Sequence, residues 1–189
     1  MSDDLFRSTL SETIALHETV KNGDARPVIS AAAAIADSLK NAGKLLVFGN
    51  GGSASDAQHA AAELVGRFQR ERAGLAAIAL TTDTSVLTSV ANDYSFDRVF
   101  ARQVEALGRR GDVALGISTS GASPNVLAAI EAAKARGLVT IALTGRDGGA
   151  VGRAAGIHVN VPSQSTARVQ EVHRTLLHVI CDFVERAFS

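Results

Sequence analysis

Two side chains four residues apart, His59 and Glu63, have the types and spacing needed for acid–base chemistry. If the segment is helical, both side chains lie on one face of the helix. An imidazole and a carboxylate placed in this way can share proton transfer or bind a zinc ion together. A solvated polar face is the more common explanation for such pairs in general. Here the pair follows a loop suited to ligand binding, so we predict a functional role for both residues.

That loop is glycine-rich and has the sequence Gly49-Asn50-Gly51-Gly52-Ser53, directly after a short apolar run. Glycines let a ligand approach the main chain, and a serine at this point can either cap the following helix or contact the ligand. The loop lacks the lysine of a P-loop and the spacing of a dinucleotide-binding fingerprint. A tight turn without a ligand is the alternative to a binding loop.

A second loop is rich in hydroxyl groups and follows the apolar run 113–117. Its hydroxyl-bearing residues are Ser118, Thr119, Ser120 and Ser123, and Pro124 follows at a position suited to the first turn of a helix. Unpaired N–H groups and the positive end of the helix dipole favour an anion there. A single serine would be enough to cap the helix, so four hydroxyls favour a phosphate site over an ordinary cap.

The last predicted helix carries further polar candidates, Gln170, His173 and His178. Gln170 and His178 are eight residues apart, so a straight helix separates their Cα atoms by about 12 Å. They could bind one metal only with long reach, or if the helix began after Gln170. Alternatively, either residue could serve a neighbouring subunit. We expect a structural role for His173.

The elements that position these residues form an alternating pattern typical of an α/β fold. Short apolar runs read as buried strands, and their alternation with helices implies a parallel sheet covered on both faces. The predicted strands are 44–48, 76–80, 113–117, 140–143 and 158–161. The predicted helices are 5–22, 27–41, 53–67, 84–91, 97–106, 124–135, 150–155 and 167–188. The helices at the two ends offer more apolar surface than one small sheet can cover, which indicates an oligomer.

Composition narrows the functional classes. The chain has 19 Lys and Arg against 19 Asp and Glu, so there is no basic excess to favour direct nucleic-acid binding. A single cysteine, Cys181, cannot form an internal disulfide and fits a reducing compartment. The first residues lack the features of a signal peptide, and no apolar run reaches the length of a membrane span. We expect a cytoplasmic protein without a membrane partner.

Taken together, these motifs resemble those of bacterial phosphoheptose isomerases, the sedoheptulose 7-phosphate isomerases of the sugar isomerase (SIS) domain superfamily. The resemblance covers nearly the whole chain and is carried by segments 49–59, 79–84, 91–94, 118–121 and 169–173, together with Glu63. It implies a three-layer, flavodoxin-like SIS fold with a five-stranded parallel sheet, N-terminal helices and a long C-terminal helix. It also implies a single SIS domain over residues 1–189, in which residues 1–42 take part in oligomer packing. The implied assembly is a homotetramer with active sites at subunit interfaces.

The resemblance also assigns site residues. Glu63 and His178 match the catalytic pair, and one zinc ion per subunit would be bound through His59, Glu63, Gln170 and His178. Substrate-binding positions are Asn50, Gly51, Gly52, Ser53, Asp93, Ser118, Thr119, Ser120, Ser123 and Gln170. The implied reaction converts sedoheptulose 7-phosphate to D-glycero-D-manno-heptose 7-phosphate through an enediol, the first step of nucleotide-activated heptose synthesis. One departure is Ala167, where some relatives have an acidic residue that contacts the substrate.

Three alternatives remain open at this point. A related SIS protein is not an enzyme but associates with the bacterial DNA replication initiator. In that group the positions matching Glu63 and His178 are not the catalytic types, whereas both are present here. A phosphosugar-sensing domain would need only the hydroxyl-rich loop of residues 118–123, which we call the serine loop. Another isomerase would act on a different sugar phosphate. If the chain is an isomerase, the base and acid roles of Glu63 and His178 could be exchanged.

Overall fold

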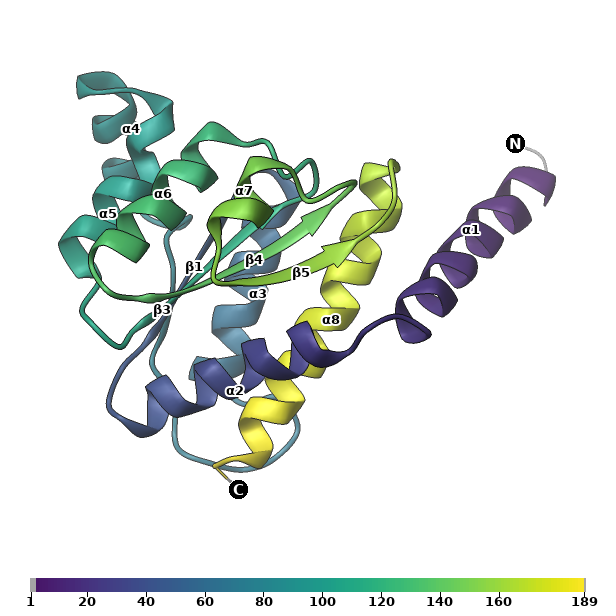
Figure 1. The fold of residues 1–189 in the computed structure, drawn as a ribbon, viewed down its shortest axis with the longest axis horizontal. Coiled ribbons are helices and arrows are strands. Elements are labelled where there is room, and N and C mark those ends of the chain that lie inside the picture. The colour runs from purple at the N-terminus through teal and green to yellow at the C-terminus, as the bar shows by residue number, and fades with distance from the viewer. Residues whose placement is uncertain (1–2, 189) are drawn as a thin grey trace.

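The computed structural model describes residues 3–188, which form a five-stranded parallel sheet between two layers of helices (Figure 1). The strand order is β2-β1-β3-β4-β5. The strands are β1 (Leu45–Gly49), β2 (Ala77–Ala79), β3 (Val113–Ser118), β4 (Val139–Gly145) and β5 (Ile157–Val161). The α/β class and the parallel sheet predicted from the sequence are confirmed.

Helices cover both faces of the sheet. One layer contains α2 (Arg26–Lys40), α3 (Gly52–Val65) and α8 (Thr166–Arg186). The other contains α4 (Thr84–Asp93), α5 (Val99–Leu107), α6 (Pro124–Ala135) and α7 (Gly149–Ala154). A short 3-10 helix, η1 (Phe96–Arg98), forms the start of the segment that the sequence predicted as one helix over 97–106.

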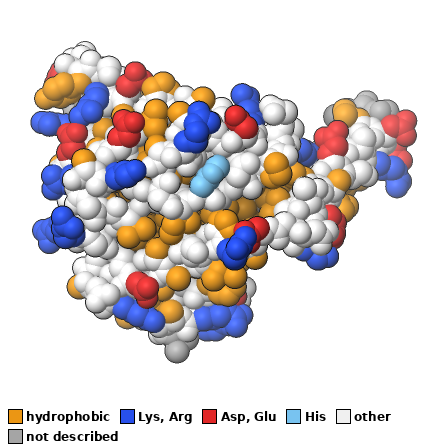
Figure 2. Space-filling view, in the orientation of Figure 1, with side chains coloured by type: hydrophobic (Ala, Val, Ile, Leu, Met, Phe, Trp, Pro, Cys, Tyr) orange, Lys and Arg blue, Asp and Glu red, His pale blue; other side chains and the backbone are white. Residues whose placement is uncertain are grey.

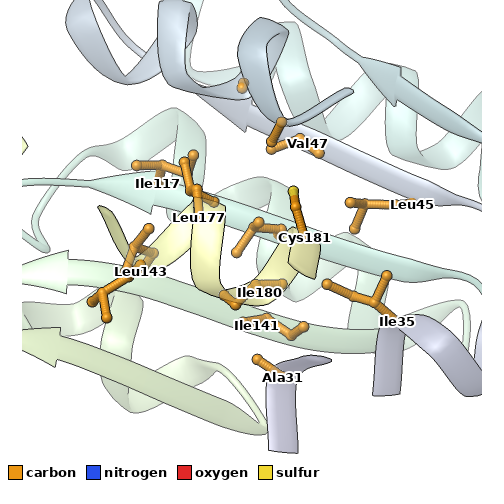
Figure 3. Packing of buried hydrophobic residues seen from close by; sticks show 14 of the residues in the cluster. Ala31, Ile35, Leu45, Val47, Ile117, Ile141, Leu143, Leu177, Ile180 and Cys181 are labelled. Atoms are coloured by element: carbon orange, nitrogen blue, oxygen red, sulfur yellow. The ribbon is translucent and has the colours of Figure 1, made fainter. Parts of the chain in front are cut away.

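Apolar side chains of α8 pack against the sheet and hold this helix in place. Leu177 and Cys181 of α8 lie near Ile117 and Val47 of the sheet, and Ile180 lies beside Ile141 (Figure 3). Buried apolar area of this kind is the main favourable contribution to folding. The packing fixes α8 relative to α3, and these two helices carry the predicted acid–base residues.

Only part of the apolar stripe of α8 is used in this core. Val179 and Phe183 stay exposed, and Ile29 of α2 is exposed beside them around a groove of about 480 Å³. Figure 2 shows hydrophobic side chains on this face, near the point where α1 leaves the body of the molecule. The chain therefore presents more apolar surface than its own sheet covers.

The first helix, α1 (Asp3–Lys21), extends away from the body of the molecule and buries none of its residues (Figure 1). Its polar contacts are with α8, where the Thr13 hydroxyl donates to Glu171 at 2.7 Å and a ring nitrogen of His17 lies 2.9 Å from the Thr175 hydroxyl. Phe6 is exposed on this helix, as are Leu10 and Ile14. No helix in the described part of the chain combines the length and apolarity needed to cross a bilayer.

Candidate active site

The serine loop lies between the end of β3 and the start of α6, at the carboxyl edge of the sheet where ligands of open parallel sheets bind. Ser118 is buried, and its hydroxyl lies 2.9 Å from that of Ser123 and 3.4 Å from that of Ser120. Ser123 occupies the N-cap position of α6, yet its side chain does not cap the helix. The hydroxyls converge on one another instead, and the helix N-terminus keeps its capacity to bind an anion.

Close backbone packing gives this loop its shape. Gly121 has φ of +65°, a left-handed conformation that side-chain-bearing residues rarely adopt. A Cβ atom at this position would overlap the backbone of Gly148 and Gly149 in the loop after β4. Thus the loops that follow β3 and β4 can approach each other only because glycines stand on both sides.

The glycine-rich loop is joined to the serine loop by a pair of amides. Asn50 donates to the Asn125 side chain at 2.8 Å, and Asn125 donates back to Asn50 at 2.9 Å. Asn125 is almost fully buried in the first turn of α6, and its oxygen also accepts the Val126 N–H group. Sequence reasoning missed Asn125, because its partner lies 75 positions away and nothing local marks the pairing. The pair fixes the relative position of the glycine-rich loop and the serine loop.

The predicted acid–base residues meet between α3 and α8. His59 Nε2 lies 2.7 Å from His178 Nε2 and 3.2 Å from a carboxylate oxygen of Glu63. All three side chains are partly buried, and one potential ligand atom from each lies within 4.8 Å of the others. The Phe68 ring packs beside the His178 ring at 5.5 Å between centroids. Residues far apart in the sequence thus form one acid–base cluster, which we call the His59–Glu63–His178 cluster.

The donor set and geometry of this cluster suit a zinc ion. Burial, followed by the nearby Arg174 guanidinium, lowers the pKa of His59, so its imidazole is neutral at pH 7 as metal ligation requires. Two nitrogens on one tetrahedral zinc are about 3.3 Å apart, given zinc–nitrogen bonds of about 2.0–2.1 Å. The two Nε2 atoms are 2.7 Å apart, so a small rotation of either ring would suffice.

Two other predicted residues lie away from this cluster. Gln170 is in the first half of α8, and its side chain packs against Gly52 at the start of α3. Because α8 begins at Thr166, the helix runs without interruption from Gln170 to His178, a rise of about 12 Å. Asp93 is exposed in the last turn of α4 and accepts a hydrogen bond from its neighbour Asn92.

The structure therefore contains two half-sites at different levels of α3. Gly51, Gly52 and Ser53 stand at its N-terminal end beside the serine loop. Glu63 lies ten residues further along, about 15 Å down the helix axis from Ser53. His59 lies about 9 Å along the axis from Ser53, so within one chain the groups suited to a phosphate and those suited to proton transfer stand at different heights on α3.

The sequence of residues 10–145 matches the SIS domain family. The chain is also 56% identical to the phosphoheptose isomerase of Citrifermentans bemidjiense over 169 residues, a match covering 89% of this chain and 88% of that protein. The chain belongs to the phosphoheptose isomerase family. Nothing among these relatives supports the alternative of a protein associated with the replication initiator.

Solved phosphoheptose isomerase structures agree with this assignment over the whole fold. The enzyme from Neisseria gonorrhoeae superimposes with a TM-score of 0.92 at 47% identity, covering 97% of this chain and 98% of that one. The enzyme from Francisella tularensis gives a TM-score of 0.94 at 39% identity, covering 98% of this chain and 100% of that one. The SIS fold predicted from the sequence is confirmed.

His173 has a different environment from the other histidines of this phosphoheptose isomerase family member. It is fully buried under the sheet, and its Nε2 lies 3.0 Å from the carbonyl oxygen of Thr144. Its Nδ1 atom is buried without a hydrogen-bond partner. Burial lowers the pKa of His173, so the ring is neutral in the folded protein. This placement agrees with the structural role expected for it.

This burial predicts how stability depends on pH. Between the lowered pKa of His173 and about pH 6.5, the unfolded chain binds a proton that the folded protein does not. We expect the free energy of unfolding to be highest above about pH 6.5 and to fall as the pH drops below it. His173→Gln keeps a donor for Thr144 and should reduce the fall, while His59 and His158, whose pKa values are also lowered, retain part of it. Urea unfolding between pH 5 and 8 measures this, and parallel curves for the two proteins would contradict it.

Proposed function

We propose that this protein is a sugar-phosphate isomerase that converts sedoheptulose 7-phosphate to D-glycero-D-manno-heptose 7-phosphate through an enediol. The observation that carries the proposal is the His59–Glu63–His178 cluster, with its ligand atoms within 4.8 Å of one another, in a chain of the phosphoheptose isomerase family. Aldose–ketose isomerisation needs a base for carbon and an acid–base group for oxygen, and this cluster offers a carboxylate and imidazoles.

In the proposed mechanism the Glu63 carboxylate takes a proton from C1 of the open-chain ketose. The electron pair of the broken C–H bond forms the C1=C2 double bond, and the C2 oxygen receives a proton from His178. His178 then takes the proton of the C1 hydroxyl as the C1 carbonyl forms. Protonated Glu63 returns its proton to C2, which gives the aldose and regenerates both groups. The cluster is partly buried between α3 and α8, which limits the access of water to the enediol.

The remote phosphate anchors the substrate in this proposal. The hydroxyls of Ser118, Ser120 and Ser123 converge beside a helix N-terminus, and Thr119 and Ser53 add further donors. Asn50, held by Asn125, lies next to them and can reach the sugar hydroxyls. Asp93 remains a proposed sugar contact. Binding energy from the phosphate end orients the reacting carbons and so lowers the barrier at the other end.

We further propose that each complete site uses two copies of the chain. The serine loop, Asn50 and Gln170 of one copy would face the His59–Glu63–His178 cluster of another, which brings together groups that one chain holds about 15 Å apart along α3. The exposed apolar residues of α1 and α8, such as Ile14 and Phe183, support such an assembly. We propose a homotetramer of this single SIS domain, packed through residues 1–42 and located in the cytoplasm.

A zinc ion is the proposed cofactor, one per subunit. His59, Glu63 and His178 would hold it, with Gln170 from a neighbouring copy as a further ligand. When bound, zinc polarises the carbonyl and stabilises the negative charge of the enediolate.

Metal removal should therefore lower turnover. We expect a chelator to reduce kcat and added zinc to restore it, and calorimetry to show one zinc per chain in the wild-type protein. His59→Ala should lose most of the zinc affinity while circular dichroism shows a folded protein. Unchanged zinc binding in this variant would place the metal elsewhere.

The experiment that tests the function is a panel of ketose phosphates of five, six and seven carbons, assayed with and without chelator. We expect the seven-carbon substrate to give the highest kcat/KM. Absence of turnover on the seven-carbon substrate in the zinc-loaded protein would overturn the proposal.

A further inference from the structure

A buried carboxylate outside the acid–base cluster has no role in the mechanism above. Glu185 lies in the last turn of α8 with a side chain that is 0% exposed. Its two oxygens accept hydrogen bonds from three consecutive backbone N–H groups, those of Phe68, Gln69 and Arg70, each at 2.9 Å. Burial by itself would raise the pKa of Glu185, but these N–H groups and the nearby Arg72 guanidinium outweigh it and lower the pKa. Glu185 is therefore a carboxylate anion at neutral pH.

Arg72 links the same loop to the helix that carries Glu63. Its side chain is 2% exposed, and its Nε lies 3.5 Å from Glu185 Oε1. Its terminal nitrogens donate to the backbone carbonyl groups of Glu63 at 2.8 Å, Leu64 at 2.8 Å and Gly66 at 3.2 Å. The last carbonyls of a helix have no partner within the helix, so Arg72 supplies what the end of α3 lacks. The final turn of α3, including Glu63, is fixed by this guanidinium.

Phe68 connects the loop to the second acid–base residue. Its backbone N–H is held by Glu185, and its ring lies against His178 at 5.5 Å between centroids, inclined by 34°. The ring therefore forms one wall beside the imidazole. One carboxylate thus acts, through the loop of residues 66–76, on the surroundings of both Glu63 and His178.

Stability alone is a poor explanation for such an arrangement. Burying a charged pair costs desolvation energy that the attraction between the charges often fails to recover, and apolar replacements of similar volume are often as stable. A carboxylate that accepts several consecutive N–H groups does something apolar residues cannot do, because it specifies one backbone conformation. The loop of residues 66–76 forms no helix or strand, so its conformation depends on contacts of this kind.

We propose that Glu185 is a positioning residue for the acid–base pair, because it fixes the loop that holds Phe68 against His178 and Arg72 against the end of α3. This inference rests on the catalytic roles proposed for Glu63 and His178. Glu185 acts through the loop, and the groups that it orients would meet the substrate.

Glu185→Gln tests the proposal with little change in volume. In either orientation of the new amide, its NH2 group would face at least one of the three backbone N–H groups, so donors would face donors and the loop would shift. We expect kcat to fall by ~10–100-fold, since small misplacements of catalytic groups have effects of this size. KM should stay within about twofold, because the serine loop is untouched. In the metal-free protein, the NMR ring-proton shifts of His178 should move, because the ring current of Phe68 acts on them.

Asp182→Asn is the matched control. Asp182 stands on the same helix and accepts hydrogen bonds from the side chains of Arg70 at 2.8 Å and Arg186 at 2.9 Å, so it contacts the same loop through a side chain only. We expect kcat and the His178 shifts to remain those of the wild type in this variant. Loss of activity in Asp182→Asn equal to that in Glu185→Gln would show that the loss of any negative charge near this loop has the same effect, and it would overturn the specific role of Glu185.

A folded Glu185→Gln protein with wild-type kcat and wild-type His178 shifts would also overturn the proposal. If Glu185→Gln does not fold, Phe68→Leu decides the question, because it removes the ring and leaves Glu185 in place. A lowered kcat with KM within about twofold of the wild type in Phe68→Leu supports the proposal, and a wild-type kcat rejects it; the His178 shifts are not used for this variant, because removing the ring moves them in any case. The NMR shifts of Glu185→Gln need no substrate, so they test this inference even if the wild-type protein turns over no sugar phosphate. That absence of turnover would contradict the proposed function alone.

Discussion

We expect Glu63→Gln to lower kcat by ~10²–10⁴-fold, the range that general acid–base catalysis supplies. Glutamine has the size of glutamate and can still hydrogen-bond to His59, which lies 3.2 Å from the carboxylate. It cannot take a proton from carbon, because an amide is not a base at neutral pH. The variant should therefore fold and assemble normally while its turnover is lost.

Steady-state kinetics on sedoheptulose 7-phosphate measures this effect, and thermal unfolding verifies the fold. Glu131→Gln is the matched control, since Glu131 is exposed on α6 and far from the cluster along the chain. This control should keep wild-type kcat. Wild-type turnover in Glu63→Gln would reject Glu63 as the base, and the reverse assignment would then give that role to His178.

The order of elements could be predicted from the sequence because each strand of a parallel sheet is buried on both faces. Such strands appear as short apolar runs between amphipathic helices, and all five runs became strands in the described structure. Their ends were less predictable. The strand predicted over 140–143 extends from Val139 to Gly145, because backbone pairing with β3 continues from Val139 to Thr144 and pairing with β5 reaches Gly145.

The position of the glycine-rich loop and the serine loop after strands β1 and β3 could also be predicted, because their signals are local. Glycines and hydroxyls next to a strand end are visible within a few residues of sequence. The groups that fix those loops and the cluster could not be predicted in the same way. Asn125 pairs with a residue 75 positions away, and Glu185 binds backbone groups 115 to 117 positions away. In the sequence Glu185 looks like an ordinary charge near the end of an amphipathic helix, and only the tertiary fold shows it to be buried.

The placement of Gln170 and His178 shows a third limit of prediction from the sequence. Helical spacing alone predicts that the Cα atoms of these two residues are about 12 Å apart. The structure adds that Gln170 packs at the level of Gly52, beside the serine loop, while His178 lies with Glu63 further along α3. A single chain therefore has one of these residues in each half-site. In a site shared between two copies, Gln170 of one copy and His178 of the other could act on the same substrate.

We therefore expect two inactive variants to restore activity to each other. Ser120→Asp places a carboxylate among the hydroxyls of the serine loop, where it repels the substrate phosphate, so this variant alone should lose at least ~10²-fold in kcat/KM. Glu63→Gln alone is inactive for the reason given above. If the two half-sites of one active site come from different copies, a mixed oligomer contains some sites with an intact serine loop and an intact Glu63. With random pairing, about a quarter of wild-type activity should return.

The measurement is turnover after the two variants are unfolded together and refolded, or co-expressed with different tags and purified as mixed oligomers. A site built within one chain predicts no recovery, because every chain in the mixture carries one of the two defects. The reciprocal mixture, wild type with a chain carrying both substitutions, sharpens the distinction. Shared sites would then leave about a quarter of full activity, since only sites with both halves from wild-type chains work, whereas self-contained sites would leave about half. Compared with self-contained sites, shared sites thus give higher activity in the first mixture and lower activity in the second. Both mixtures test whether the carboxylate that takes the proton and the hydroxyls that hold the phosphate belong to the same chain.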